Sequence, residues 1–436
     1  MIRLILLLLG ARAVQRRWDI LASLGLVWLG FGIWLLANLQ NRKVVYVEDM
    51  LAMLLGLEGL VLLAAAGILG FRRNWGDLLR GLCFLGGAFL VFNVNWDHNI
   101  GATIVFGSVF LADGILRILS ALILRGSRLK VGIATGLVSI LFAVLIFMRW
   151  PVPHQVTVPF CLALLFLWSG HNILRAAIQL RRLPKGASIT GLPLYAAFNW
   201  QARGVAVPLL PPGSGPVEGE LNVRIWTATG AIDDAVNYPV INRYVAAVDR
   251  KGAVSTGHAA LELPPDLYIS HYPAVEIDHD AGEALRILHS GRKNDVPGRF
   301  QPSLAVEAGE WCMPTRTVTL RRYNDAALRA FWAEYSRDNT YNLAARNCST
   351  TVALALDAAT EGLASTGRPL RDFLRLILNP EVWVLRLVRG RAEGMTWTPG
   401  LVLDYSSLLQ QVLEHGHRRW RDRLTSALHE RGKETM

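Results

Sequence analysis

One cysteine and one histidine are the residues of this chain best suited to perform chemistry. Cys348 follows Asn347 at the end of a polar loop and begins an alanine-rich apolar run, so the sequence predicts a helix whose first residue is the cysteine. A thiol at that position lies among unpaired backbone N–H groups at the positive end of the helix dipole. We expect this setting to lower the pKa of the thiol and to make it a nucleophile.

Such a nucleophile needs a base, and His258 offers one on a predicted strand about 90 residues upstream, within the span of one domain. The pair predicts acyl transfer. Cys348 attacks a carbonyl carbon, His258 moves the proton, and N–H groups at the helix start, positioned by Asn347, stabilise the oxyanion. The alternative interpretation of Cys348 is a buried thiol on a core helix.

A third catalytic group depends on the hairpin that carries His258. Its two predicted strands occupy residues 254–263 and 267–272, with two prolines between them. If residues 263–266 form a four-residue loop, His258 lies opposite His271, and cross-strand partners have Cβ atoms about 5 Å apart. His271 is therefore the predicted group that orients His258. A slip of one residue would break this arrangement.

The cysteines and acidic clusters give no sign of a bound metal. Cys83 and Cys161 lie within apolar runs, Cys312 has no base or helix cap beside it, and no paired Cys-x-x-Cys spacing occurs. The stretch 276–280 places a histidine and carboxylates consecutively rather than on one face, so we interpret it as a solvated loop. The sequence predicts no metal, no cofactor and a reducing compartment.

The elements that must position the site form a predicted α+β domain over residues 219–362. A strand is expected on either side of the hairpin, and an amphipathic helix over 325–336 precedes the cysteine helix. Residues 363–436 follow as helices. The first of them surround apolar residues with arginines, so we expect them to lie in the membrane interface or, alternatively, to form a helical hairpin that packs on the transmembrane bundle.

A membrane domain precedes these elements. The chain has 436 residues, 52% of them hydrophobic, and nearly all of the apolar excess lies before residue 182. Six apolar runs of about 20 residues, the length that a helix needs to cross a bilayer, occupy 19–39, 49–70, 76–95, 100–123, 130–149 and 157–180. We expect residues 1–18 to be an amphipathic lead-in at the interface and the Pro- and Gly-rich residues 183–218 to be a linker.

The distribution of charge indicates orientation rather than nucleic-acid binding. The net charge is +11, but no basic stripe with interleaved aromatic residues occurs, so we expect no nucleic-acid partner. The basic residues cluster at alternate ends of the apolar runs. By the positive-inside rule, both termini of this multi-pass protein lie in the cytoplasm, and the lipid bilayer is its first partner.

The predicted membrane domain, residues 19–182, repeats a two-helix hairpin three times. Glycines recur at about 55-residue spacing, Gly25, Gly81 and Gly136 in the odd runs and Gly59, Gly114 and Gly170 in the even runs. Glu58, Asp113 and Arg117 lie at membrane depth, where charge is costly. Either Glu58 and Asp113 form a proton-responsive pair, or Asp113 and Arg117, one turn apart, form an ion pair that fixes helix packing.

Residues 15–185 resemble the HdeD family of acid-resistance membrane proteins. The resemblance rests on the six short helices, the tight loops and the segment Asp113-Gly114-Ile115-Leu116-Arg117, echoed at 170–175. It implies a bacterial inner-membrane protein associated with acid resistance.

Residues 220–360 resemble the circularly permuted papain-like hydrolases related to NlpC/P60, LRAT and PPPDE proteins. The matching features are Gly257-His258, the segment Tyr268 to Pro273, and Asn347-Cys348, with the histidine before the cysteine. The resemblance implies that Cys348 is the nucleophile, His258 the base and His271 a third, orienting group.

Two hypotheses follow for this fold, a six-helix membrane bundle with a cytoplasmic papain-like α+β domain and C-terminal helices. In the first, the chain is a cysteine peptidase, amidase or acyl hydrolase that acts on a membrane-proximal peptide or lipid. In the second, it is a non-enzymatic acid-resistance membrane protein with a degenerate cytoplasmic binding domain. Either hypothesis is compatible with a homo-oligomer.

Overall fold

The computed structural model of the protein describes residues 1–39, 52–53, 55–57, 59–60, 63, 75–91, 100–124, 129–148, 150, 153, 156–192, 195, 209–211, 215–228, 247–248, 254–275, 289–394 and 396–414. The chain divides into two compact units. We call Met1–Asp19, Ser120–Lys130 and Ala176–Gly416 the mixed unit, and Ile20–Leu119, Val131–Arg175 and His417–Met436 the helical unit.

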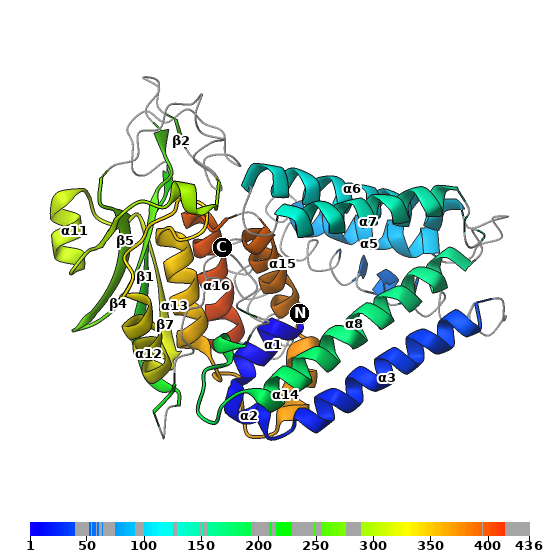
Figure 1. Ribbon diagram of the computed structural model, residues 1–436, viewed down its shortest axis with the longest axis horizontal. Coiled ribbons are helices and arrows are strands. Elements are labelled where there is room, and N and C mark those ends of the chain that lie inside the picture. Colours follow the sequence, from blue (N-terminus) through cyan, green and yellow to red (C-terminus); the bar gives the residue numbers. More distant parts are fainter. Residues whose placement is uncertain are drawn as a thin grey trace, which may run out of the picture. The chain divides into compact units, whose positions relative to one another are not determined.

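The helical unit draws on α3 (Trp18–Ala37), α5 (Trp75–Val91), α6 (Ile100–Leu124), α7 (Leu129–Phe147) and α8 (Thr157–Arg182), shown in Figure 1. Among the described residues, four helices are long and apolar enough to cross a membrane, within α3, α6, α7 and α8. Leu26, Leu116 and Trp168 expose 58 to 69% of their surface, as expected of helices that face lipid. The chain thus has the character of a membrane protein.

Two of the six predicted spans have no counterpart among these four. The run 76–95 overlaps the described helix α5, which has 17 residues. The run 49–70 lies largely outside the described residues, and Glu58 with it. Six spans stay a prediction.

The predicted repeat glycines meet in pairs inside the helical unit. The pairs are Gly25 with Gly170, Gly59 with Gly81, and Gly114 with Gly136. A Cβ on any of the six would lie 2.7 to 3.1 Å from the carbonyl oxygen of its partner glycine, so only glycine allows this approach. Each pair combines one glycine from an odd apolar run with one glycine from an even apolar run.

We expect substitution at a paired glycine to destabilise the helical unit. Gly114→Ala would place a Cβ 2.7 Å from the Gly136 carbonyl oxygen, so the helices must separate, at a cost of roughly 1–3 kcal/mol. Gly30→Ala is the matched control, because nothing lies within 4 Å of its Cβ position. Thermal unfolding in detergent measures both, and equal midpoints for the two variants would contradict the pairing.

The mixed unit is built on a five-stranded antiparallel sheet of order β6-β5-β4-β1-β7. The strands are β1 (Val217–Trp226), β4 (His258–Leu263), β5 (Leu267–Pro273), β6 (Gly298–Phe300) and β7 (Arg316–Tyr323). A separate two-stranded sheet pairs β2 (Ala247–Val248) with β3 (Val254–Ser255). The hairpin and the flanking strands occur in the predicted order.

Helices cover both faces of this sheet (Figure 1). On one side α13 (Cys348–Thr360) packs on β4 and β5, α16 (Pro399–Glu414) packs on β1 and β7, and α12 (Asp325–Tyr335) packs on α13. On the other side lies α11 (Leu304–Glu310), whose Leu304 joins a core cluster with Trp226 and Tyr268. The short 3-10 helix η6 (Arg292–Asn294) precedes β6.

The register of the β4–β5 hairpin differs by one residue from the prediction. Glu262 pairs with Tyr268 and Leu263 pairs with Leu267, whereas a four-residue loop would have paired Glu262 with Leu267. Leu263 remains in the strand because its apolar side chain is buried, only 3% exposed. Since side chains alternate between faces, the slip moves His271 away from His258.

The N-terminal segment is a core element rather than a lead-in at the membrane interface. Helix α1 (Ile2–Leu9) buries six consecutive apolar side chains, Leu4 to Leu9, each at most 2% exposed. A helix that is apolar on all sides is stable when protein surrounds it, and α1 contacts α13 and α14 (Pro369–Ile377). The short α2 (Ala11–Gln15) follows it.

Glu361, directly after α13, ties three distant segments together. Its carboxylate, 3% exposed, accepts hydrogen bonds from the Ala11 N–H at 3.3 Å, the Ile189 N–H at 2.9 Å and the Ser188 hydroxyl at 2.5 Å. Ile189 begins the 3-10 helix η3 (Ile189–Gly191) and is fully buried. The start of the predicted linker is therefore packed within the mixed unit.

We expect Glu361→Ala to destabilise the mixed unit by roughly 2 kcal/mol or more, because it leaves buried donors without an acceptor. Asp266→Ala is the control, since that carboxylate is exposed in its pair with Arg329. The measurement is thermal unfolding of the full chain. A midpoint for Glu361→Ala no lower than that of Asp266→Ala would contradict the assignment.

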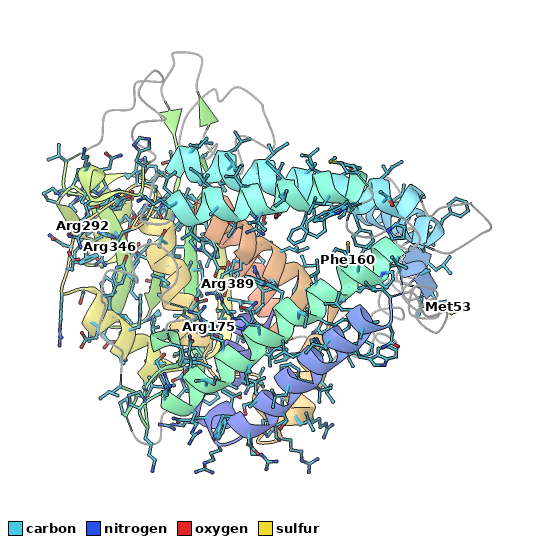
Figure 2. All side chains as sticks on the ribbon, turned by 45° about the vertical axis from the view of Figure 1, so that its right-hand side comes forward. Met53, Phe160, Arg175, Arg292, Arg346 and Arg389 are labelled. Atoms are coloured by element: carbon cyan, nitrogen blue, oxygen red, sulfur yellow. The ribbon has the colours of Figure 1, made fainter. Side chains whose placement is uncertain are left out.

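A buried ion pair fixes the middle of α13. The two carboxylate oxygens of Asp357 each accept a 2.6 Å hydrogen bond from the guanidinium of Arg389, which is labelled in Figure 2. Arg389 belongs to α15 (Pro380–Gly394), and the Tyr405 hydroxyl of α16 donates to the same carboxylate at 2.7 Å. The pair, with Tyr405, joins α13 to α15 and α16.

Candidate functional site

Helix α13 begins at Cys348, as the sequence predicts. The side-chain oxygen of Asn347 accepts a 2.7 Å hydrogen bond from the Thr350 N–H and so caps the helix. The amide nitrogen of Asn347 donates to the Leu343 carbonyl at 2.7 Å and to the Trp397 carbonyl at 3.1 Å. Asn347 therefore fixes the position of the helix start with both ends of its amide.

The thiol itself lies out of water. Cys348 is 7% exposed, and burial raises the pKa of its thiol above the usual value. Hydrogen bonds from the Ser349 side chain and the Ala259 backbone oppose this effect but do not reverse it. The expectation of a lowered thiol pKa was wrong, because loss of hydration outweighs the field of the helix start.

His258 is buried on the first position of β4, 3% exposed. Its Nε2 lies 2.9 Å from the Ser270 hydroxyl and 3.2 Å from a carboxylate oxygen of Glu307. Its ring stacks on Tyr272 with a centroid distance of 4.0 Å. Removal from water and, to a smaller extent, the nearby His271 lower the pKa of His258 to about 3, so the ring is neutral at pH 7 despite the neighbouring Glu307 carboxylate.

Helix α13 packs on β4, so the backbone beside His258 lies near the thiol. The backbone of Ala259, the next residue after His258, lowers the pKa of the Cys348 thiol against the larger effect of burial. Charge on Cys348 also helps to raise the pKa of Tyr272, the residue stacked on His258, although burial and Glu307 act more strongly. Within the described residues, no hydrogen bond joins the thiol to the imidazole.

His271 serves a different purpose from the one predicted. It is fully buried, with Nδ1 3.2 Å from the Thr351 hydroxyl of α13 and Nε2 3.2 Å from the Asn339 carbonyl oxygen. Burial lowers its pKa to about 4. Because the hairpin register places Tyr272 rather than His271 opposite His258, His271 packs against α13 and does not orient the candidate base.

Glu307 is the site residue that the sequence interpretation missed. No element is predicted from the sequence for its segment, which forms α11. The available signal was Ser303 directly before an apolar residue, since the Ser303 side chain caps the helix by accepting from the Val306 N–H at 3.3 Å. Only the fold determines that the Glu307 carboxylate points inward, where the residue is 1% exposed.

In the helical unit, the predicted ion pair between Asp113 and Arg117 forms with a distance of 2.6 Å. The Ser139 hydroxyl of α7 donates to the same carboxylate oxygen at 2.8 Å. The carboxylate therefore links α6 to α7, which agrees with the packing interpretation. Pairing with Glu58 lies outside the described residues.

Comparison with the models of known protein families, with curated proteins and with solved structures found no match. Both resemblances therefore stay predictions. Among the described residues, no group of three or more histidine, cysteine or acidic side chains is arranged to hold a metal ion.

The two buried histidines should make the mixed unit less stable in acid. The pKa of His258 falls to about 3 and that of His271 to about 4, both below the ordinary 6.5. Between pH 6.5 and these values the unfolded chain binds more protons than the folded chain, so stability rises with pH. We expect stability to be full above about pH 6.5 and to be lost progressively toward about pH 4.

The measurement is the unfolding midpoint as a function of pH for the wild type and His271→Asn. The variant should show a shallower fall because it lacks one of the two rings. Identical slopes would contradict a neutral, buried His271.

Proposed function

We propose that the mixed unit is a thiol hydrolase attached to a membrane-spanning helical unit, with Cys348 as nucleophile and His258 as base. The observation that carries the proposal is that α13, which begins with Cys348, packs on β4, which begins with His258. A cysteine at a helix start with a histidine on the adjoining strand is an arrangement suited to acyl transfer.

The buried setting favours a neutral thiol and a neutral imidazole before substrate binds. The Cys348 proton then moves to His258 as the sulfur bonds to the carbonyl carbon, and the carbonyl oxygen takes the negative charge. Backbone N–H groups at the start of α13 stabilise that oxyanion. The imidazolium returns its proton to the leaving group, and water, deprotonated by His258, hydrolyses the resulting acyl-enzyme.

The C-terminal helices support a substrate at the membrane surface. Helices α14 and α15 expose a set of large apolar side chains, Leu370, Leu374, Leu378, Trp383 and Leu387, each at least 50% exposed. Arginines flank them, and such a surface fits the lipid interface with the charges among the phosphates. We propose that the substrates are peptides or lipids held at the bacterial inner membrane. We also propose that this chain lies in that membrane with both of its termini in the cytoplasm.

A second candidate function is a non-enzymatic acid-stress membrane protein whose mixed unit only binds. The missing hydrogen bond between the described Cys348 and His258 side chains favours it, as does the neutral state of both groups. The HdeD-like organisation predicted from sequence supports the same alternative.

The two candidates differ in the reactivity of Cys348. We would measure iodoacetamide alkylation against pH for the membrane-embedded protein, with peptide mass spectrometry separating Cys348 from Cys312. If His258 is the base, His258→Ala should slow alkylation of Cys348 at pH 7 by about tenfold or more and shift its pH profile upward.

His271→Asn is the matched control, since it removes an equally buried histidine that contacts α13 elsewhere. Its alkylation profile should follow the wild type. If His258→Ala also leaves the profile unchanged, Cys348 is a structural thiol and the non-enzymatic function takes precedence.

A further inference from the structure

The Glu307 carboxylate lies at the centre of a buried polar cluster on the α11 side of the sheet. It accepts hydrogen bonds from the Tyr268 hydroxyl at 2.5 Å and the Tyr272 hydroxyl at 2.7 Å. The same oxygen that contacts Tyr272 lies 3.2 Å from Nε2 of His258. Glu307 is 1% exposed, so every partner of its carboxylate is a protein group fixed by the fold.

The geometry keeps this carboxylate an acceptor. Burial and the nearby Glu307 charge raise the pKa of both tyrosines, which therefore remain hydroxyl donors at any working pH. A carboxylate surrounded by donors favours the His258 tautomer that carries its proton on Nε2. The other ring nitrogen, Nδ1, makes no hydrogen bond within the described part of the chain and is free to accept a proton.

We propose that Glu307 is the positioning residue of His258: its carboxylate holds the Nε2–H and leaves Nδ1 to receive the thiol proton of Cys348. This inference rests on the proposed thiol hydrolase function. It gives the role predicted for His271 to a residue from a different element, α11.

The charge on Glu307 matters most after the proton has moved. When Cys348 gives its proton to His258, the ring becomes an imidazolium inside a site that excludes water. A carboxylate 3.2 Å from Nε2 stabilises that charge, whereas a neutral amide of the same shape does not. Glu307 thus increases the population of the reactive thiolate only while His258 is present.

The test compares wild type, Glu307→Gln, His258→Ala and the double variant by the pH-dependent alkylation of Cys348 in the full membrane-embedded chain. Glu307→Gln should slow alkylation at pH 7 by about tenfold, the equivalent of one pKa unit, and shift the profile upward. The double variant should be no slower than His258→Ala alone, because Glu307 acts through the ring. Glu307→Asp, which keeps the charge, should recover part of the rate.

Glu310→Gln is the matched control, because it removes an exposed carboxylate from the same helix. Thermal unfolding of each variant separates loss of fold from loss of reactivity. If His258→Ala slows alkylation and a folded Glu307→Gln does not, the role of Glu307 is overturned while the proposed function stands. Additive losses in the double variant would also overturn it, since they indicate a purely structural role. If His258→Ala has no effect, the proposed function and this inference both fail.

Discussion

Helix α13 begins inside the mixed unit, where the Cys348 thiol, the capping amide of Asn347 and the backbone of β4 are all withheld from water. The loss of hydration decides the chemistry of the site. It raises the pKa of the thiol and lowers that of His258, so both groups are neutral and neither activates the other by charge alone. Any reactivity must then come from polar partners that the fold places around the ring, and these come from α11 and β5.

The position of the thiol depends on how firmly α13 is held. Asn347 joins its start to the Trp397 carbonyl, Asp357 joins its middle to Arg389, and Glu361 joins the segment after it to the N-terminal helices. These contacts involve elements from both ends of the sequence. A buried carboxylate or guanidinium that loses its partner is costly, so each connection constrains the helix strongly. The mixed unit consequently includes the first 19 residues of the chain, which a division by sequence order would assign to the membrane part.

The helices of the helical unit are held together by close approach of their backbones, whereas the elements of the mixed unit are held together by buried side chains. The three glycine pairs of the helical unit place helices near enough that a single methyl group would collide with a backbone carbonyl. The glycines that recur in the sequence therefore make the same kind of close approach in all three pairs. Asp113 adds a polar connection at one of these contacts, since Arg117 and Ser139 both donate to it.

Patterns that depend on near neighbours in the chain could be interpreted from the sequence. The cap at Asn347, the helix from Cys348, the strands of the hairpin and the pair Asp113–Arg117 all follow from local spacing. The repeat glycines were likewise visible, although not which glycine meets which. Tertiary structure alone decided the one-residue register that separates His271 from His258, the burial of α1 and the contact of Glu307 with His258. Those features depend on which surfaces lose water together, and that is set by packing between residues far apart in the chain.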